Sequence, residues 1–172
     1  MRETGRSGCP INLAVEVLGD RWSLLILRDM IFAGKRSYNQ LLDGDERIAT
    51  NILRDRLNFL VKSGLLTKSP DPDQPRRKIY RLTARSIALV PLLVHLGFWG
   101  QQWLPASPSL RRKAKELFAG GPVLWDEIMA GLSEARPSRA EVGQSGKTKR
   151  AVSVTKVTQP PVLGENSIAR KK

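Results

Sequence analysis

Apolar residues recur at steps of three and four from residue 48 to residue 61, with polar residues between them. The apolar positions are Ile48, Ile52, Leu53, Leu57, Leu60 and Val61. Their spacing predicts an amphipathic helix over residues 49–63, with one buried face and a C-terminal stop at Gly64. Four polar residues fall together on the opposite face, which is expected to be exposed: Thr50, Asn51, Arg54 and Asn58.

Three shorter helices are predicted earlier in the chain, each with a recognisable start. Their ranges are 11–18, 22–32 and 37–42. Pro10 suits the first turn of the first helix, and Asp20 can cap the second. Ser37 and Gln40 have the spacing of a capping box at the start of the third. The second helix is so apolar that we expect it inside the domain.

Two short strands are predicted after the amphipathic helix. They cover residues 65–69 and 78–82, and the loop between them is rich in proline and charge. A capped short helix, an amphipathic helix and a two-stranded hairpin in this order predict a winged helix-turn-helix. We therefore expect a mostly α-helical fold with a small two-stranded β wing.

The apolar residues after the wing exceed what one small domain can bury. Thr83 can cap a long helix over residues 84–103, whose apolar residues cover more than one face. We therefore expect a partner subunit to cover part of this helix. Two further helices are predicted over residues 109–118 and 123–132. The sequence leaves open whether they pack on their own domain or extend a dimer interface.

The charge of the chain favours a polyanionic partner. Its 172 residues carry a formal net charge of +13. Residues 137–172 contain eight basic and two acidic residues, and we expect them to form a disordered basic tail. The remainder of the chain is therefore basic in its own right. Together with the helix-turn-helix pattern, this charge predicts double-stranded DNA as a partner.

The sequence argues against several other classes of function. No segment approaches the roughly 20 apolar residues of a membrane span, and the N-terminus lacks the apolar core of a signal peptide, so a cytoplasmic protein without a membrane partner is expected. With one cysteine and one histidine, no metal site and no cofactor are predicted. Because no nucleophile with a base, carboxylate pair or phosphate loop is evident, no enzyme activity is expected.

The exposed helix face and the wing carry side chains that suit DNA. Arginine can present a bidentate fork to guanine, asparagine can pair with adenine, and threonine can reach a base edge or a phosphate. We therefore expect the four polar residues of the helix face to contact bases. The wing residues expected along the phosphate backbone are Arg76, Arg77 and Lys78.

Residues 9–100 resemble the HxlR-type branch of the MarR-like winged-helix regulators. The resemblance rests on the stretches CP, GDRWSLLILRD, RSYNQL, IATNILRDRL and GLL, which follow in the family's order and approximate spacing. It implies a sequence-specific transcriptional regulator that binds a pseudo-palindromic operator as an obligate homodimer. The two reading helices of such a dimer enter successive major grooves.

The resemblance also assigns roles to particular residues. It places the dimer interface on the first helix and the long late helix, where the candidates are Leu13, Val17, Leu93, Leu96, Trp99 and Trp103. It places Arg36 near a phosphate, and Ser37 beside it is a further DNA-binding candidate. Cys9 matches a cysteine that some relatives use to sense oxidants or electrophiles, which makes an oxidant or small-molecule effector a candidate partner. The alternative is that this cysteine is half-buried and has no sensing role.

Three points stay open at this stage. Arg56 either forms an internal salt bridge or contacts a phosphate. Ala49 stands where many relatives have a capping serine, so Thr50 is a candidate cap for the reading helix. The alternative to a sequence-specific regulator is a non-specific architectural DNA-binding protein, which needs only charge and deformable DNA.

The expected organisation has four parts. They are a flexible N-terminus over residues 1–8, a winged domain with dimerisation helices over 9–103, a helical extension over 104–136, and the basic tail over 137–172.

Overall fold

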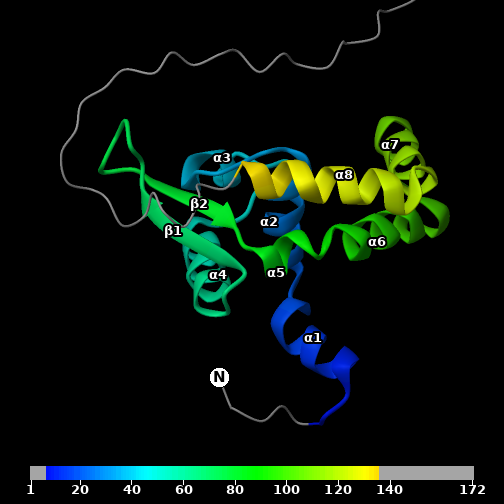
Figure 1. Cartoon of the computed structure of the whole chain (residues 1–172), viewed down its shortest axis with the longest axis horizontal. Helices are drawn as coiled ribbons and strands as arrows, with labels where there is room; N and C mark the ends of the chain where they lie inside the picture. The colour runs from blue at the N-terminus through cyan, green and yellow to red at the C-terminus, as the bar shows by residue number, and fades with distance from the viewer. Residues whose placement is uncertain (1–6, 136–172) are drawn as a thin grey trace, which may run out of the picture. The chain divides into compact units, whose positions relative to one another are not determined.

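The computed structural model describes residues 7–135, which form eight helices and two strands (Figure 1). The predicted basic tail lies outside the described residues, as do residues 1–6 of the predicted N-terminal segment. Within the described range, no helix is both long and apolar enough to cross a bilayer.

The first half of the fold contains the predicted helices. They are α1 (Pro10–Leu18), α2 (Arg21–Phe32), α3 (Tyr38–Leu42) and α4 (Thr50–Lys62). Oδ1 of Asp20 accepts hydrogen bonds from the backbone N–H groups of Trp22 and Ser23 at 3.0 and 2.9 Å, and so caps α2. The capping box of Ser37 and Gln40 is present at the start of α3. These helix starts are therefore confirmed.

The wing is a two-stranded antiparallel sheet. It consists of β1 (Leu66–Pro70) and β2 (Lys78–Leu82), paired in the register Leu66 to Leu82. The backbone before α3 adds a short bridge to this sheet, because Ser37 pairs with Ile79 and the N–H of Tyr80 donates to the carbonyl of Arg36 at 2.7 Å. Sequence reasoning missed this bridge, since a contact of one or two residues produces no alternating pattern.

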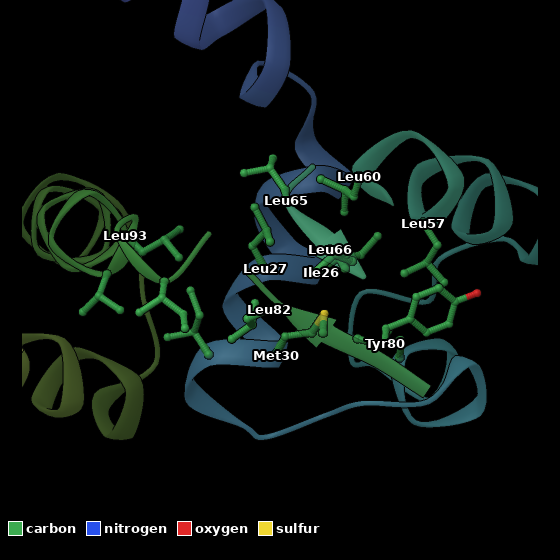
Figure 2. Close-up of a cluster of buried hydrophobic side chains, with 14 of the residues drawn as sticks. Ile26, Leu27, Met30, Leu57, Leu60, Leu65, Leu66, Tyr80, Leu82 and Leu93 are labelled. Atoms are coloured by element: carbon green, nitrogen blue, oxygen red, sulfur yellow. The ribbon is translucent and has the colours of Figure 1, made fainter. Parts of the chain in front are cut away.

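The core lies around α2, between α4, the wing and the later helices. Leu27 and Met30 of α2 and Leu53, Leu57 and Leu60 of α4 are completely buried. Figure 2 shows part of this cluster together with Leu66, Tyr80 and Leu82 of the wing and Leu93 of a later helix. Because both α2 and the wing pack on the inner side of α4, that helix is held with its other side open.

The expected single long helix after the wing is wrong. The chain forms a short helix and a longer one, α5 (Ala84–Ile87) and α6 (Val90–Trp103). Pro91 lies in the first turn of α6. Proline has no N–H to donate and its ring collides with the carbonyl four residues earlier, so a helix through Ile87 cannot continue past it. The same residue is well tolerated at a helix start.

The last two helices pack on their own domain. They are α7 (Pro108–Ala119) and α8 (Gly121–Glu134), and Figure 1 shows α8 running alongside α6. The rings of Phe98 and Phe118 stack at 3.8 Å between centroids, and His95 meets Phe118 and Trp125 edge-on at 5.4 and 5.1 Å. Nε1 of Trp125 donates to the carbonyl of Leu117 at 2.7 Å. Both helices therefore pack on their own domain, and a further part in a dimer interface stays a prediction.

Candidate nucleic-acid interface

One side of α4 is anchored and the other is free. Leu53, Leu57 and Leu60 fix the inner side in the core. The polar residues on the outer side are all exposed: Thr50, Asn51, Arg54 and Asn58. We call these four residues the α4 polar face. Their common exposure follows from the helical period, because steps of three and four bring them to one side.

Arg54 is the one cation among these four residues. Its side chain is 69% exposed, and Nε lies 3.6 Å from a carboxylate oxygen of Asp55, which is itself 58% exposed. An ion pair so open to water contributes little to stability. The guanidinium can therefore leave Asp55 for another acceptor at small cost.

The start of α4 carries no side-chain cap. Ala49 occupies the N-cap position and Thr50 is the first helical residue. The expectation that Thr50 replaces the missing cap is therefore wrong, and its hydroxyl is free of that role. Backbone N–H groups of an uncapped first turn can bind an anion such as a phosphate.

Tyr38 holds the first residue of α4 in place, a role that sequence reasoning missed. Its hydroxyl donates to the backbone carbonyl of Thr50 at 2.8 Å. The bond joins α3 to α4 across twelve residues, and no local pattern signals a contact of that kind.

A group of ion pairs ties the turn before α4 to α2. Nη1 and Nη2 of Arg28 donate to the two carboxylate oxygens of Glu46 at 2.5 and 3.0 Å, and Asp29 lies between Arg28 and Lys35. The hydrogen bond to Glu46 raises the pKa of Arg28, and the same bond lowers the pKa of Glu46. The charge of Arg28 is therefore used inside the subunit.

Arg56 faces inward as well. Its Nη1 lies 3.5 Å from Oδ2 of Asp20, and its guanidinium lies 5.3 Å from the centre of the Phe59 ring. Partial burial acts to raise the pKa of Asp20, but the hydrogen bonds from Ser23 and the charge of Arg56 together bring it below its ordinary value. Of the two roles left open for Arg56, the structure has the internal salt bridge.

The wing cations differ in how far they are committed. Arg76 and Lys78 are exposed, and neither has an ion pair or side-chain hydrogen bond within the described part of the chain. Arg77 is engaged: its Nη2 donates to Oγ of Ser37 at 2.8 Å, and its Nε lies 3.7 Å from Asp71. Arg77 thus joins the wing to the start of α3.

Two residues predicted to touch DNA form hydrogen bonds within the subunit. Nη1 of Arg36 donates to the backbone carbonyls of Met30 and Lys35, and burial lowers the pKa of Arg36. Ser37 is only 1% exposed, and its hydroxyl accepts from the N–H of Gln40. Ser37 is therefore closed to a phosphate, whereas only Nη1 of Arg36 is engaged and a phosphate contact by Arg36 stays a prediction.

The predicted interface residues are mostly exposed apolar side chains, with two exceptions. Val17 is half-buried, and Leu93 is 8% exposed within its own core, which corrects its assignment to an interface. Leu92, one residue earlier on the helix, is 48% exposed instead. The remaining predicted residues are all exposed: Leu13, Leu96, Trp99 and Trp103.

Cys9 lies at the N-cap of α1 and is exposed, so the half-buried alternative is wrong. Among residues 7–135, no cluster of three or more potential metal ligands occurs.

Comparison with known proteins gives a consistent result. A family profile described as HxlR-like helix-turn-helix matches residues 17–108, more than half of the chain. The HTH-type transcriptional regulator sll1512 of Synechocystis sp. is 38% identical over 102 residues, which cover 59% of this chain and 74% of that protein. The HTH-type transcriptional regulator Rv3095 of Mycobacterium tuberculosis is 39% identical over 98 residues, 57% of this chain and 61% of that protein.

Solved structures agree with the fold. PA1607, assigned as a transcription factor, matches 60% of this chain and 70% of its own with a TM-score of 0.54 and 35% identity. A regulator of Porphyromonas gingivalis W83 assigned to the MarR family matches 60% of this chain and 100% of its own, with a TM-score of 0.50 and 27% identity.

Proposed function

The chain belongs to the HxlR-like helix-turn-helix family and is a transcriptional regulator, and from this premise we propose that it reads a pseudo-palindromic operator as a homodimer. The observation that carries the proposal is the α4 polar face. It is exposed along the helix, while the opposite face of the same helix is completely buried. A rigid helix with an open polar face is suited to a major groove.

Within this proposal, bases and phosphates are contacted by different elements. Asn51, Arg54 and Asn58 contact base edges. Arg76 and Lys78 of the wing lie along the phosphate backbone, because they are exposed and have no partner among the described residues. The uncapped start of α4 binds a further phosphate through its backbone N–H groups.

Exposed apolar residues support the homodimer. Leu92, Leu96, Trp99 and Trp103 follow one another at steps of four, three and four along α6, and all are about half exposed or more. We call them the α6 stripe. Ile11 on α1 is a further exposed apolar side chain, at 75% exposure, that a second copy could cover. A run of exposed apolar residues along one helix, such as the α6 stripe, is typical of an interface.

Selection of bound DNA tests the proposal. The purified full-length chain is incubated with genomic fragments, and the bound fragments are sequenced and footprinted. We expect enrichment of a pseudo-palindrome whose half-sites are centred about 34–36 Å apart, one helical turn of DNA. Fragments without a common motif would contradict sequence-specific binding.

The second candidate function is architectural DNA binding, favoured by the net charge of +13. Such a protein neutralises phosphates without reading bases, so its affinity falls steeply with salt and hardly depends on sequence. The open polar face of α4 favours the regulator, because architectural binding makes no use of it.

An oxidant is the effector we propose for Cys9, which is exposed at the start of α1. Diamide takes one hydrogen from each of two Cys9 thiols, one per subunit, and becomes the hydrazine as the two sulfur atoms form a disulfide. We expect diamide to change operator affinity of the wild type and to leave Cys9→Ser unchanged. Equal responses of the two proteins would contradict this role.

A further inference from the structure

Two adjoining cavities lie on the side of α2 that faces α6 and α7. The larger, of about 680 Å³, is also lined by the turn that leads into α4, and the smaller has about 310 Å³. Both are lined by Arg28, Gly97, Leu110 and Ala114. Because α7 lies almost entirely beyond the segment that matches the family, this chain builds the site partly from its own extension.

The wall of the larger cavity is acidic in a protein that is otherwise strongly basic. Four carboxylates and two cations line it. Arg28 and Lys35 are already paired with two of these carboxylates, those of Asp29 and Glu46. Asp43 and Asp45 are exposed, and neither forms an ion pair within residues 7–135. They leave a local negative charge beside the cavity.

Gln101 adds an unpaired amide to the same wall. The residue is 7% exposed and lines the larger cavity. Its side chain makes no hydrogen bond to any described residue. Ser23 Oγ is the only fully buried side-chain polar atom without a hydrogen-bond partner among the described residues, so the amide of Gln101 is accessible from the cavity and free to bind water or a ligand.

The smaller cavity offers an apolar chamber next to this polar one. Its wall includes Leu24, Phe32, Leu93, Leu96 and Leu117, so the cavity borders the α6 stripe at Leu96. At Gly97, where the two cavities meet, an added Cβ would touch nothing within 4 Å. A ligand with a polar end and an apolar body can therefore lie across both cavities.

We propose that the joined cavities bind a small organic cation with an apolar body. The ammonium group lies near Asp43 and Asp45 and donates to the side-chain amide oxygen of Gln101. The apolar body of the ligand fills the smaller cavity. This assignment rests on the proposed DNA-binding function in one respect. The turn that contains Asp43 and Asp45 leads into α4, so an occupied site acts on the reading helix as an effector.

Three ligands with one apolar body test the charge preference. The probes are 4-phenylbutylammonium, 4-phenylbutanol and 4-phenylbutyrate, each titrated calorimetrically into the full-length protein without DNA. We expect the ammonium to bind about fivefold or more tighter than the alcohol, and the carboxylate to bind most weakly. Equal affinities, or no binding of the ammonium, would overturn the proposal.

Paired variants locate the site. The double variant Asp43→Asn with Asp45→Asn should bind the ammonium no more tightly than the alcohol. The control variant Asp126→Asn on α8 should still bind the ammonium more tightly. Gly97→Leu should abolish binding by filling the junction, whereas Gly131→Leu, where an added Cβ also meets nothing, should bind normally. Binding unaffected by both the double variant and Gly97→Leu would place the ligand elsewhere and refute the site.

A second copy of the chain is the rival occupant. In that case the wild type would not bind the ammonium, and Gly97→Leu would change the oligomeric state measured by light scattering. Operator binding of the ligand-free protein is measured in parallel. If the ammonium binds but no operator is bound, the cation site stands and the proposed function fails; if the operator is bound but no ammonium is, the cation site alone fails.

Discussion

Charged side chains around α4 fall into two groups according to whether an acceptor from another part of the chain holds them. Arg28, Arg36 and Arg56 are each held by internal acceptors. Arg54 and Arg76 are open to solvent. The sequence could predict the open group on α4, because the helical period alone sets its face. It could not predict which arginines turn inward, because their acceptors come from other elements.

Arg54 is predicted to read a base. Arg54→Ala should cost about 1–3 kcal/mol of operator binding and relax the preference at one base pair. Affinities for a panel of single-base operator variants, measured by fluorescence anisotropy, check this. Arg76→Ala is the matched control, and it should weaken all sequences alike and reduce the salt slope by roughly one. Identical profiles for the two variants would contradict the division between reading helix and wing.

Arg77 is predicted to stabilise the fold more than its neighbour Arg76. Arg77→Ala removes a hydrogen bond to the buried Ser37 and should lower the free energy of unfolding by about 1–3 kcal/mol. Arg76→Ala, which removes an exposed side chain, should change it by less than about 0.5 kcal/mol. Urea unfolding of both variants is the measurement. Equal midpoints would show that the hydrogen bond to Ser37 does not stabilise the fold.

At the level of elements, the chain positions α4 by bonds that join segments far apart in sequence. The helix starts at Asp20 and Ser37 and the two strands of the wing could be predicted, because caps and alternation are local signals. Pro91 is a local signal for a break between two helices, but the apolar residues continue on both sides of it and favour one long helix instead. The bridge of Ser37 to β2 could not be predicted, because its pairing depends on the folded chain.

The ion pair between α2 and the turn before α4 predicts an acid-sensitive fold. Glu46 has a pKa below its ordinary value of 4.5, so its carboxylate stabilises the folded state above about pH 4.5. This contribution is lost as the pH falls through the lowered pKa. We expect the free energy of unfolding to fall on acidification and to fall less steeply in Glu46→Gln. Asp126→Asn is the control, and a Glu46→Gln profile parallel to that of the wild type would contradict the account.

At the scale of the whole molecule, the apolar surface left open on α1 and α6 determines the expected assembly. The sequence indicated an excess of apolar residues in this region, and the structure identifies which of them remain exposed after α7 and α8 have packed. Leu93 shows the limit of the sequence argument. Residues 92 and 93 are both leucine, and only the packing of α6 against α2 decides which of them is buried.

Trp99, in the α6 stripe, is predicted to stabilise a dimer. Trp99→Ser should weaken self-association by about 2 kcal/mol or more, as expected for a buried aromatic residue at an interface. Val123→Ser on α8 is the control, since Val123 is 72% exposed and belongs to a different helix from the stripe. Analytical ultracentrifugation measures the monomer fraction across concentration. A wild type that stays monomeric, or a Trp99→Ser variant that dimerises as well as the wild type, would refute this interface.

Competition between a selected operator and unrelated DNA of equal length tests the central claim most directly. The claim is that the open side of α4 reads sequence, and the measured quantity is the ratio of the two affinities at physiological salt. A sequence-specific regulator should prefer its operator by about 10³-fold or more, and Arg54→Ala should reduce that ratio. A ratio near one in the wild type would contradict the claim and leave the architectural function in its place.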